Sequence, residues 1–328
     1  MKGRTIVITG VTGKAVLPIA AELARDNEVF GTSRFSRADE REIVEAYGIR
    51  PCRADLAEGD FAKVPKNPDH LLHFAWLRSS ADRLSEAMRV NVEGAGLLLD
   101  HVRPARSALI VSSSAVYRGN PDPLHRYRED DPLGAGPSIA AATSATCKIA
   151  LESVSRIAAR TLGIPMTIAR LNTVMGPHLA FYGKKLRALL DGVEIILPNE
   201  REAHNPIHIE DMASQVEALL DAAGRKEPLT INWSGDEVVA TSDALARMEA
   251  RTGRDANICV RPAPGLAGGT VTDWRRRRAI TGPCQVEFTS ALDRMLDEMV
   301  DGAAPANPQR NWEYSTAFQN RIFRGATD

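Results

Sequence analysis

Residues 5–24 read TIVITGVTGKAVLPIAAELA, and this stretch decides the fold of the chain. The residues TIVIT at its start are apolar or β-branched, as in a buried parallel strand. Gly10 and Gly13 follow in a short turn, and apolar residues then recur with helical spacing from Val16 to Leu23. Strand, glycine turn and helix in this order predict a dinucleotide-binding start. Glycines let the backbone approach a pyrophosphate, and a helix N-terminus offers free N–H groups.

The glycine pattern is incomplete, since Val16 stands where the pattern TGxxGxxG has its third glycine. That third glycine serves close packing between helix and strand rather than contact with phosphate. We therefore expect Val16 to change the packing of the helix without preventing dinucleotide binding. The alternative is an ordinary strand-to-helix turn that binds no ligand.

The bulk composition is that of a soluble globular protein, with 328 residues, 44% hydrophobic residues and 25% charged residues. A net charge of -1 gives no electrostatic reason to expect nucleic acid or a membrane surface as a partner. No apolar run reaches transmembrane length, and because residues 1–4 lead directly into the first strand, we expect no signal peptide. The cysteines are scattered and form no CxxC pair, so we expect no metal site, no disulfide framework and a cytoplasmic protein.

The end of the second expected strand, at residues 28–33, bears on the choice of cofactor. An acidic residue there would hold the ribose hydroxyls of NAD, whereas a basic residue can pair with the 2′-phosphate of NADP. The strand ends at Ser33, and Arg34 and Arg37 follow it. The next acidic residue, Asp39, comes too late to be the strand-end acid, so the sequence favours NADP over NAD. The alternative is a solvated loop with ordinary arginines.

Strand and helix patterns continue to alternate along the chain. We expect further strands at residues 49–54, 71–75, 108–113 and 166–171, and long helices at residues 81–102 and 138–160. The fold class is therefore α/β, a doubly wound parallel sheet of the Rossmann type with a smaller mixed C-terminal substrate domain. Residues 1–177 are expected to form the NADP-binding Rossmann domain, with residues 205–225 returning to it. Residues 178–328 are expected to form mainly the substrate-binding domain and a C-terminal tail.

Several short motifs carry a resemblance to a known family. They are TGVTG at residues 9–13, Asp55-Leu56, HFAW at 73–76, NVEG at 91–94, SSSAVY at 112–117, Lys148 with Glu152, ARLNTVMGP at 169–177 and NPIHIED at 205–211. With these motifs in this order, the chain resembles the extended short-chain dehydrogenase/reductases, the NAD(P)-dependent epimerase/dehydratase superfamily. The resemblance covers about residues 4–300.

The resemblance implies a catalytic unit of Ser or Thr together with Tyr-x-x-x-Lys. When a hydride moves to or from a nicotinamide, a proton must also move to or from the substrate oxygen. The Tyr phenol is the acid or base for this proton, and the nearby Lys ammonium lowers the pKa of the phenol. By resemblance, Ser113 takes the Ser role and Lys148 the Lys role. The residue four positions before Lys148 is Ser144 rather than Tyr. A serine hydroxyl is too weak an acid for this task unless a strong base acts on it.

Three hypotheses account for the missing phenol. In the first, another group supplies the proton, with Tyr117 as the first candidate, followed by Tyr182, His178 and Tyr127. In the second, Ser144 and Lys148 act through a bound water, or the substrate is acidic enough to need little help. In the third, the site is inactive and the chain binds NADP as a sensor or partner protein.

The residues expected at the site fall into three groups. The catalytic group comprises Ser113, Lys148, Tyr117 and Ser144. The cofactor-binding group comprises Gly10, Thr12, Gly13, Ser33, Arg34, Arg37, Asp55, Leu56, Phe74, Ala75, Trp76, Asn91 and Lys148. Substrate contacts are expected from Ser114, Asn172 and His178.

The sequence therefore predicts an NADP(H)-dependent oxidoreductase that acts on a small carbonyl or alcohol substrate with a non-standard proton donor. The enzymatic alternative is a nucleotide-sugar-type epimerase, and the alternative of another class is a catalytically silent NADP-binding regulatory protein. Dehydration is disfavoured, because Ser114-Ala115 stands where dehydratases of this family carry an acidic pair. The resemblance also implies a homodimer paired through the helices at 81–102 and 138–160. The basic run at 275–278 is expected to be a solvated helix face.

Overall fold

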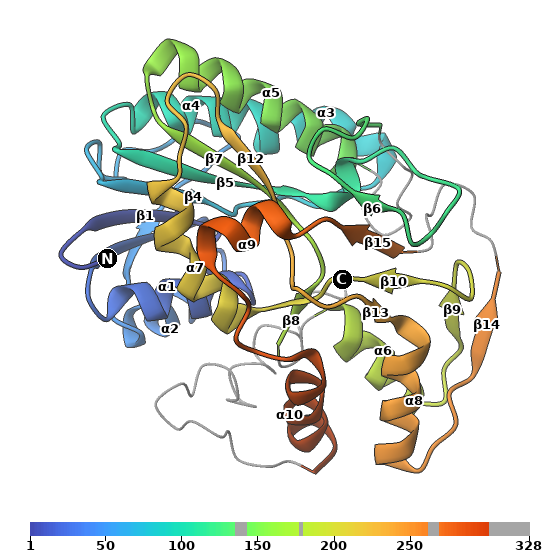
Figure 1. Cartoon of the computed structure of the whole chain (residues 1–328). Helices are drawn as coiled ribbons and strands as arrows, with labels where there is room; N and C mark the ends of the chain where they lie inside the picture. The colour runs from blue at the N-terminus through green and yellow to red at the C-terminus, as the bar shows by residue number, and fades with distance from the viewer. Residues whose placement is uncertain (135–142, 177–179, 262–268, 302–328) are drawn as a thin grey trace.

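The computed structural model of the chain describes residues 1–134, 143–176, 180–261 and 269–301. Its largest element is a seven-stranded sheet in the order β12-β7-β5-β4-β1-β2-β3, with every neighbouring pair parallel (Figure 1). The strands are β1 (Thr5–Thr9), β2 (Glu28–Ser33), β3 (Arg50–Arg53), β4 (His70–His73), β5 (Ser107–Ser113), β7 (Met166–Leu171) and β12 (Leu229–Trp233). The strand order reverses between β1 and β4, so loops from both sides open there at the carboxyl edge of the sheet.

Helices cover both faces of this sheet (Figure 1). One face carries α1 (Val16–Ala24), α2 (Glu40–Ala46), α7 (Ile209–Asp221) and α9 (Arg275–Thr281), and the other carries α3 (Leu84–Met88), α4 (Gly94–His101) and α5 (Ser144–Leu162). Two helix layers on a parallel sheet confirm the predicted doubly wound α/β fold. Within the described ranges, no helix is both long and apolar enough to cross a membrane.

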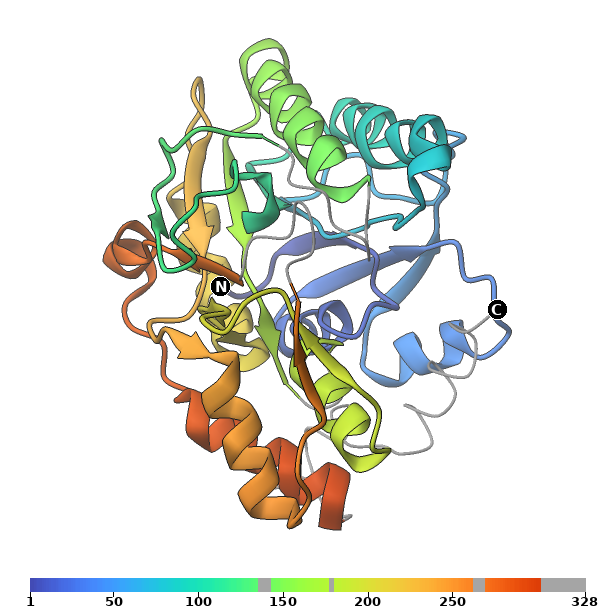
Figure 2. The ribbon, with the colours of Figure 1, turned by 90° about the vertical axis from the view of Figure 1, so that its right-hand side faces the viewer.

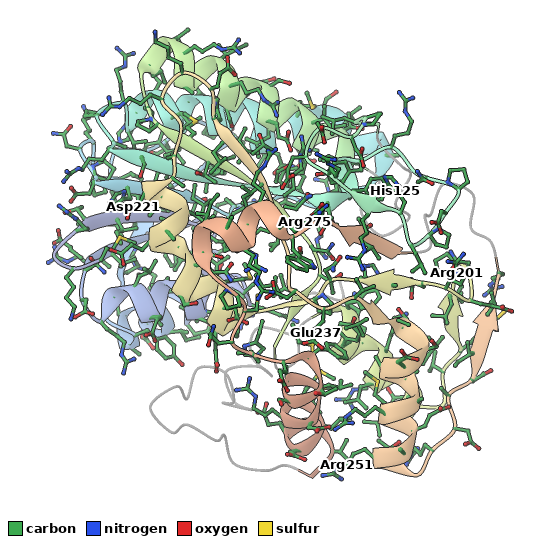
Figure 3. All side chains as sticks on the ribbon, viewed as in Figure 1. His125, Arg201, Asp221, Glu237, Arg251 and Arg275 are labelled. Carbon is green, nitrogen blue, oxygen red and sulfur yellow. The ribbon has the colours of Figure 1, made fainter. Side chains whose placement is uncertain are left out.

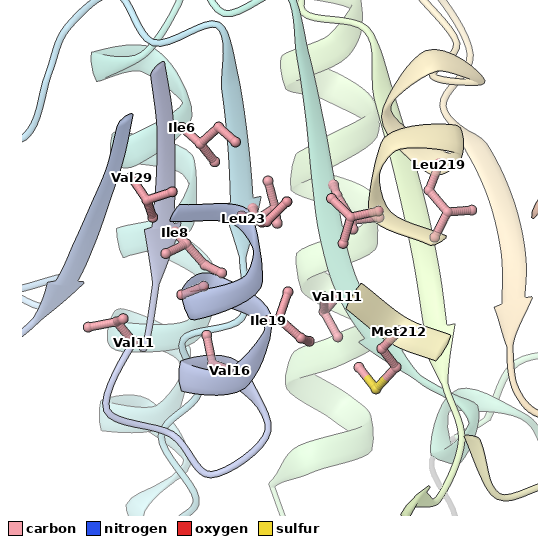
Figure 4. Close-up of a cluster of buried hydrophobic side chains, with 14 of the residues drawn as sticks. Ile6, Ile8, Val11, Val16, Ile19, Leu23, Val29, Val111, Met212 and Leu219 are labelled. Atoms are coloured by element: carbon pink, nitrogen blue, oxygen red, sulfur yellow. The ribbon is translucent and has the colours of Figure 1, made fainter. Parts of the chain in front are cut away.

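The apolar core begins with the stretch that decides the fold. Ile6 and Ile8 of β1 and Ile19 of α1 are fully buried, and they join Val111 of β5 and Met212 of α7 in one cluster (Figure 4). Burying an aliphatic side chain of this size contributes about 1.5–3 kcal/mol. The strand and helix that flank the glycine turn are therefore held in place by the core, and this determines the position of the turn between them.

The helix expected at residues 81–102 is interrupted. It divides into a 3₁₀ turn (Ala81–Arg83), α3, a π-helical turn (Arg89–Glu93) and α4. Asn91 lies in the π-helical turn, and its buried amide forms hydrogen bonds with both the backbone N–H and the backbone carbonyl of Leu77. The helix widens at this turn, as π-bulges do, and the amide is used to hold the loop that follows β4.

The C-terminal half contributes most of a second, smaller part of the molecule (Figure 2). This part has its own apolar cluster. A four-stranded sheet has the order β13-β10-β15-β6, and two short strand pairs, β8 with β11 and β9 with β14, lie beside it. These elements are β6 (Arg126–Tyr127), β8 (Val174–Met175), β9 (Ile195–Leu197), β10 (Ala203–His204), β11 (Ile207–His208), β13 (Val239–Ala240), β14 (Ile258–Val260) and β15 (Gly269–Thr272), with helices α6 (Ala180–Leu190), α8 (Thr241–Thr252) and α10 (Phe288–Asp301).

The chain crosses between the two parts more often than the sequence suggested. Besides α7, the strand β12 and the helix α9 also lie against the main sheet, beyond the segment 205–225 that was expected to return to it. In the other direction, β6 from the loop after β5 pairs with β15 of the smaller sheet. The predicted tail at residues 303–328 lies outside the described residues.

Candidate active site

The glycine turn between β1 and α1 is the best-defined part of the site. Gly10 has φ +72°, and a Cβ atom placed on it would lie 3.0 Å from the Cα of Ala75, which follows β4. Within the described residues, the backbone N–H groups of Thr12 and Ala15 have no hydrogen-bond partner. Free N–H groups at a helix start, with no side chain between backbone and ligand, fit the pyrophosphate of a dinucleotide.

The end of β2 lies beside the glycine turn, where the sequence predicts contacts to the adenosine part of a dinucleotide. The hydroxyl oxygens of Ser33 and Thr12 lie 3.3 Å apart, which joins the strand end to the glycine turn. Arg34 is exposed, whereas Arg37 forms an ion pair of 3.3 Å with Asp39. Arg34 is thus the more available of the two arginines that the sequence analysis assigned to a 2′-phosphate.

The loop after β3 contains Asp55 and Leu56, which the sequence predicts to contact the cofactor on the same side as the end of β2. The side chain of Asp55 accepts the backbone N–H of Ala57 at 2.9 Å, so the carboxylate is used to shape its own loop. A Cβ atom at Gly94 would lie only 2.4 Å from the carbonyl oxygen of Leu56. Glycine at position 94 is therefore required for the loop containing Leu56 to approach α4 closely.

The loop after β4 is anchored to β1 by a buried polar group. The hydroxyl of Thr9 lies 3.0 Å from Nδ1 of His73 and accepts the backbone N–H groups of Phe74 and Ala75 at 3.0 and 2.9 Å. Burial, with a smaller effect of the Lys148 charge, lowers the pKa of His73 to about 3. The ring is neutral at physiological pH, and its Nδ1 accepts the proton of the Thr9 hydroxyl. This anchor determines where Ala75 and Trp76 lie relative to the glycine turn.

Ser113 ends β5 at the same edge of the sheet. Its hydroxyl is half-buried and accepts the backbone N–H of Ala115 at 3.2 Å, which starts a single 3₁₀ turn (Ser114–Val116). Ser114 is buried, and its carbonyl accepts the backbone N–H of Tyr117. Ser113 is therefore the more accessible hydroxyl of the two.

Lys148 reaches the end of β5 from α5. Its amine donates a hydrogen bond of 2.6 Å to the carbonyl of Val111 and lies 3.7 Å from the ring centroid of Trp76. The residue is 6% exposed, and burial lowers the pKa of the amine to about 7. Ser144, the first residue of α5, is one helical turn earlier on the same helix face. The structure thus brings Lys148 and Trp76 together in one corner, near the end of the strand that carries Ser113, with Ser144 one turn earlier on α5.

Tyr117 does not lie free in this corner. Its hydroxyl donates to the amide oxygen of Asn232 at 2.5 Å and accepts a hydrogen bond from Arg170 at 3.1 Å. The residue is 4% exposed, and burial raises the pKa of the phenol to about 12. A phenol that holds its proton this firmly and already donates it to Asn232 is poorly suited to the role of proton donor predicted for it.

Arg170 links Tyr117 to a buried carboxylate. Its guanidinium makes two hydrogen bonds of 2.9 Å to Glu152 of α5, which also accepts the hydroxyl of Ser112 at 2.7 Å. Glu152 is fully buried, and the hydrogen bonds and charge of Arg170 outweigh the cost of burial, so its pKa is lowered. These contacts form a continuous buried network from β5 through α5 and β7 to β12.

The other candidates for the missing phenol are also accounted for. The hydroxyl of Tyr127 accepts the backbone N–H of Asn120 at 2.8 Å, and its ring stacks on Tyr117. Tyr182 is buried in the C-terminal part, where burial raises the pKa of its phenol. His178 lies outside the described residues.

The amides of Asn91 and Asn172 are occupied by the protein itself. Asn91 holds Leu77, as described above, rather than facing the cofactor side of the turn. Asn172 is buried and donates to the carbonyl of Thr270 at 3.0 Å, while its side-chain oxygen accepts the N–H of Thr173. Both geometries favour positioning roles over the direct cofactor and substrate contacts predicted for these residues. Phe74 packs against Trp233, with ring centroids 6.1 Å apart.

The basic run on α9 is only partly the solvated face that was expected. Arg275, which is labelled in Figure 3, is exposed and pairs with Asp273. Arg276 and Arg278 are also exposed. Arg277 is fully buried and forms an ion pair with Asp236. The run therefore includes one internal cation that ties α9 to the chain after β12.

Sequence reasoning missed the internal network of Arg170 and the contact between Trp76 and Lys148. The sequence contained an indication of this network. Lys148 and Glu152 are four residues apart and so share one helix face, and Ser112 and Arg170 are polar residues within mainly apolar strand segments. No local signal predicts that Trp76 covers Lys148, since the two residues are joined only by the fold. Within the described residues, no group of His, Cys, Asp or Glu side chains is arranged to hold a metal ion.

Comparisons with known proteins agree with this geometry. The family described as "NAD dependent epimerase/dehydratase family" matches residues 6–232, more than half of the chain. Among curated proteins, no sequence matches this chain.

Solved structures share the fold at low sequence identity. MoeE5 in complex with UDP-glucose and NAD has a TM-score of 0.77 and 20% identity, covering 92% of this chain and 100% of that one. The UDP-glucuronic acid 4-epimerase from Bacillus cereus, with UDP-glucuronic acid and NAD, has a TM-score of 0.78 and 17% identity, with 92% and 100% covered. DesIV, the dTDP-glucose 4,6-dehydratase from Streptomyces venezuelae, has a TM-score of 0.76 and 19% identity, with 90% and 98% covered. The family match, together with the glycine turn and the parallel sheet, shows that the chain belongs to the NAD-dependent epimerase/dehydratase family.

Proposed function

We propose that the chain binds a nicotinamide dinucleotide and carries out hydride transfer on a nucleotide-linked sugar, in the manner of an epimerase. The observation that carries this proposal is the position of Lys148. Its amine is buried at the end of β5, on the strand of Ser113, at the sheet edge where the glycine turn opens. The proposal prefers the epimerase alternative to the small carbonyl or alcohol substrate expected from the sequence, because the similar structures are complexes with nucleotide sugars or nucleotides.

An anionic substrate is supported by the charges around the glycine turn. The pKa of Lys14 is lowered to about 8, first by partial burial and then by the positive charges of Lys184 and Arg78. These cations come from the turn after β1, from α6 and from the loop after β4, so two separate parts of the molecule contribute to one positive region. The diphosphate of a nucleotide-linked sugar is an anion that would relieve this repulsion.

We propose that NADP is preferred over NAD, although the similar structures contain NAD. The support is the exposed Arg34 directly after β2, together with the ion pair that occupies Asp39. Arg34→Ala is expected to weaken NADP binding about tenfold, the effect of losing one charge-assisted contact of about 1.4 kcal/mol, and to leave NAD binding unchanged. Arg50→Ala, which removes an exposed arginine on β3, is the matched control. Equal affinities for both cofactors in the unaltered protein would refute the preference.

In the proposed reaction, the chain's own groups handle the proton. When bound, the nicotinamide ring accepts or returns the hydride. The hydroxyl of Ser113 is positioned to orient the substrate oxygen, and the Lys148 amine, whose pKa is lowered to about 7, can accept and return the hydroxyl proton. Ser144 is one turn away on α5, and its hydroxyl can take part in that proton transfer.

The test is to incubate the protein with NAD or NADP and with UDP-glucose, UDP-glucuronic acid or dTDP-glucose, and to follow epimer formation by NMR. We expect an epimer from at least one sugar, and its loss in Lys148→Met. Lys66→Met, which removes an exposed lysine that was assigned no role in the site, serves as the control. Cofactor affinity is measured in parallel, so that loss of turnover can be separated from loss of binding.

The second candidate function is a catalytically silent cofactor-binding protein. It is favoured by the contact between Trp76 and Lys148, which leaves the lysine 6% exposed, and by the serine at position 144. Tight cofactor binding without turnover of any of these sugars would decide for this candidate and against hydride transfer.

We also propose a homodimer formed through the outer surfaces of α4 and α5, which lie side by side (Figure 1). Leu97 of α4 and Ile157 of α5 are 53% and 60% exposed, which is unusual for large aliphatic side chains on neighbouring helices. Sedimentation velocity tests this proposal. The unaltered chain should sediment as a dimer and the Leu97→Asp, Ile157→Asp double variant as a monomer, whereas a monomeric unaltered chain would refute it.

A further inference from the structure

The backbone that carries Trp76 is held on both sides. Before it, Thr9 accepts the N–H groups of Phe74 and Ala75. After it, the buried amide of Asn91 bonds to both the N–H and the carbonyl of Leu77, at 2.7 and 2.9 Å. Because hydrogen bonds hold the backbone on both sides of Trp76, the position of its Cα and the direction of its Cα–Cβ bond are determined by the fold.

The indole of Trp76 packs between the helices and the amine of Lys148. It is half-buried and lies against the apolar cluster of Ala87, Val92 and Cys147. The lysine nitrogen lies 3.7 Å from the ring centroid, and it donates one hydrogen bond to Val111 at 2.6 Å. With the ring on one side and the strand on the other, the amine is shielded from water.

The charges that face Lys148 do not compensate for this burial. On α5, the carboxylate of Glu152 attracts the ammonium, but it is already bound by two hydrogen bonds from Arg170 and one from Ser112. Cys147 is the other titratable neighbour on α5, and from β4 the ring of His73 is neutral, with a pKa of about 3. Burial is the largest effect, and the pKa of Lys148 falls to about 7.

A serine at position 144 leaves α5 without an aromatic ring one turn before the lysine. The ring on the lysine comes instead from the loop after β4. We infer that Trp76 is a positioning residue for Lys148: its indole excludes water from the amine and so maintains the lysine as the proton-transfer group that the chain otherwise lacks.

This inference rests on the proposed function for its chemical step. As the C–H hydride of a substrate alcohol passes to the oxidised nicotinamide, the O–H proton passes to the unprotonated Nζ of Lys148, and a C=O bond and an ammonium are formed. On return of the hydride the ammonium gives the proton back to the oxygen. An amine that is half-protonated near neutral pH can act in both directions, which an epimerase requires.

The decisive experiment measures the titration of Lys148 directly. Lysine labelled with ¹³C at Cε is followed by NMR against pH in the unaltered chain, and the Lys148 signal is assigned from its absence in Lys148→Arg. We expect a midpoint near 7 in the unaltered chain and in Trp76→Phe, which keeps a ring over the amine. Trp76→Ala, which admits water, should raise the midpoint by at least one unit, a tenfold change in proton affinity.

A matched control is Trp274→Ala, because Trp274 carries the guanidinium of Arg278 over its ring on the far side of the main sheet. Trp274→Ala should leave the Lys148 midpoint unchanged. If the loss of any tryptophan shifted the midpoint through a general structural effect, both Trp76→Ala and Trp274→Ala would shift it. The inference is overturned if Lys148 titrates near 10 in the unaltered chain, or if Trp76→Ala leaves its midpoint in place. Because the titration needs no substrate, a shifted midpoint without sugar turnover supports the inference and refutes the proposed function. Where turnover is found, the acidic limb of kcat should move with the midpoint.

Discussion

The glycine turn and the Lys148 corner lie at the same edge of the sheet but are built in different ways. At the turn, the functional atoms are backbone N–H groups, and the side chain that matters is the one missing from Gly10. At the corner, the atoms of interest belong to side chains from the loop after β4, from the end of β5 and from α5, and their properties depend on burial and neighbouring charges. The proposed binding of a dinucleotide therefore depends on local geometry, whereas the proposed chemistry depends on long-range packing.

The largest expected effect is a loss of folding stability when Arg170, which belongs to the buried network near the corner and not to the turn, is replaced. Arg170→Met leaves Glu152 buried without its main partner, and removal of one partner of a buried ion pair costs about 3–5 kcal/mol. Urea unfolding measures the loss. Arg156→Met is the control, since Arg156 bonds to the same carboxylate at 2.8 Å but is 30% exposed, and it should cost less than about 1 kcal/mol. Similar losses in both variants would show that the network does not depend on Arg170.

The next effect breaks the turn and leaves the corner intact. In Gly10→Ala, a Cβ atom meets the Cα of Ala75 at 3.0 Å on a backbone with φ +72°. We expect cofactor affinity to fall about 100-fold, equivalent to about 2.7 kcal/mol, because the turn must move away from its ligand. Gly48→Ala is the control, because Gly48 has φ +73° with no atom within 4 Å of the added Cβ, and it should lower stability without changing affinity. Isothermal titration with both cofactors measures the difference, and unchanged affinity in Gly10→Ala would remove the turn from the binding site.

The smallest expected effect concerns His73, which joins the two regions. Its pKa is lowered to about 3 in the folded chain, from an ordinary value of about 6.5, so below pH 6.5 only the unfolded chain takes up the proton. Stability is therefore lost as pH falls, by about 2 kcal/mol at pH 5 relative to pH 7.5 for this group alone. In His73→Asn, which keeps an acceptor for Thr9, the difference in unfolding free energy between these pH values should be smaller by that amount. Parallel pH curves for both proteins would mean that His73 is protonated in the folded state.

Much of the fold could be predicted because its signals are local. The order of β1, glycine turn and α1 follows from residue types that are adjacent in the sequence. The later strands β4, β5 and β7 of the main sheet were recognisable as short, mainly apolar runs, whereas the two- to four-residue strands of the smaller sheet were not. The helix at residues 81–102 was predicted as continuous because its apolar spacing is helical throughout. Asn91 lies in the π-helical turn and bonds to Leu77, a contact that helical periodicity does not reveal.

For the site, the sequence by itself determined which groups are present: Ser113 and Lys148, to which the resemblance gives catalytic roles, and Ser144 four positions before the lysine. Only the tertiary structure decided what these groups can do. It committed Tyr117 to Asn232, 115 residues away, and it placed Trp76 over Lys148. The physical reason is that the proton affinity of a side chain depends on the water and charges around it. Those surroundings are supplied by strands and helices that meet only in the folded chain.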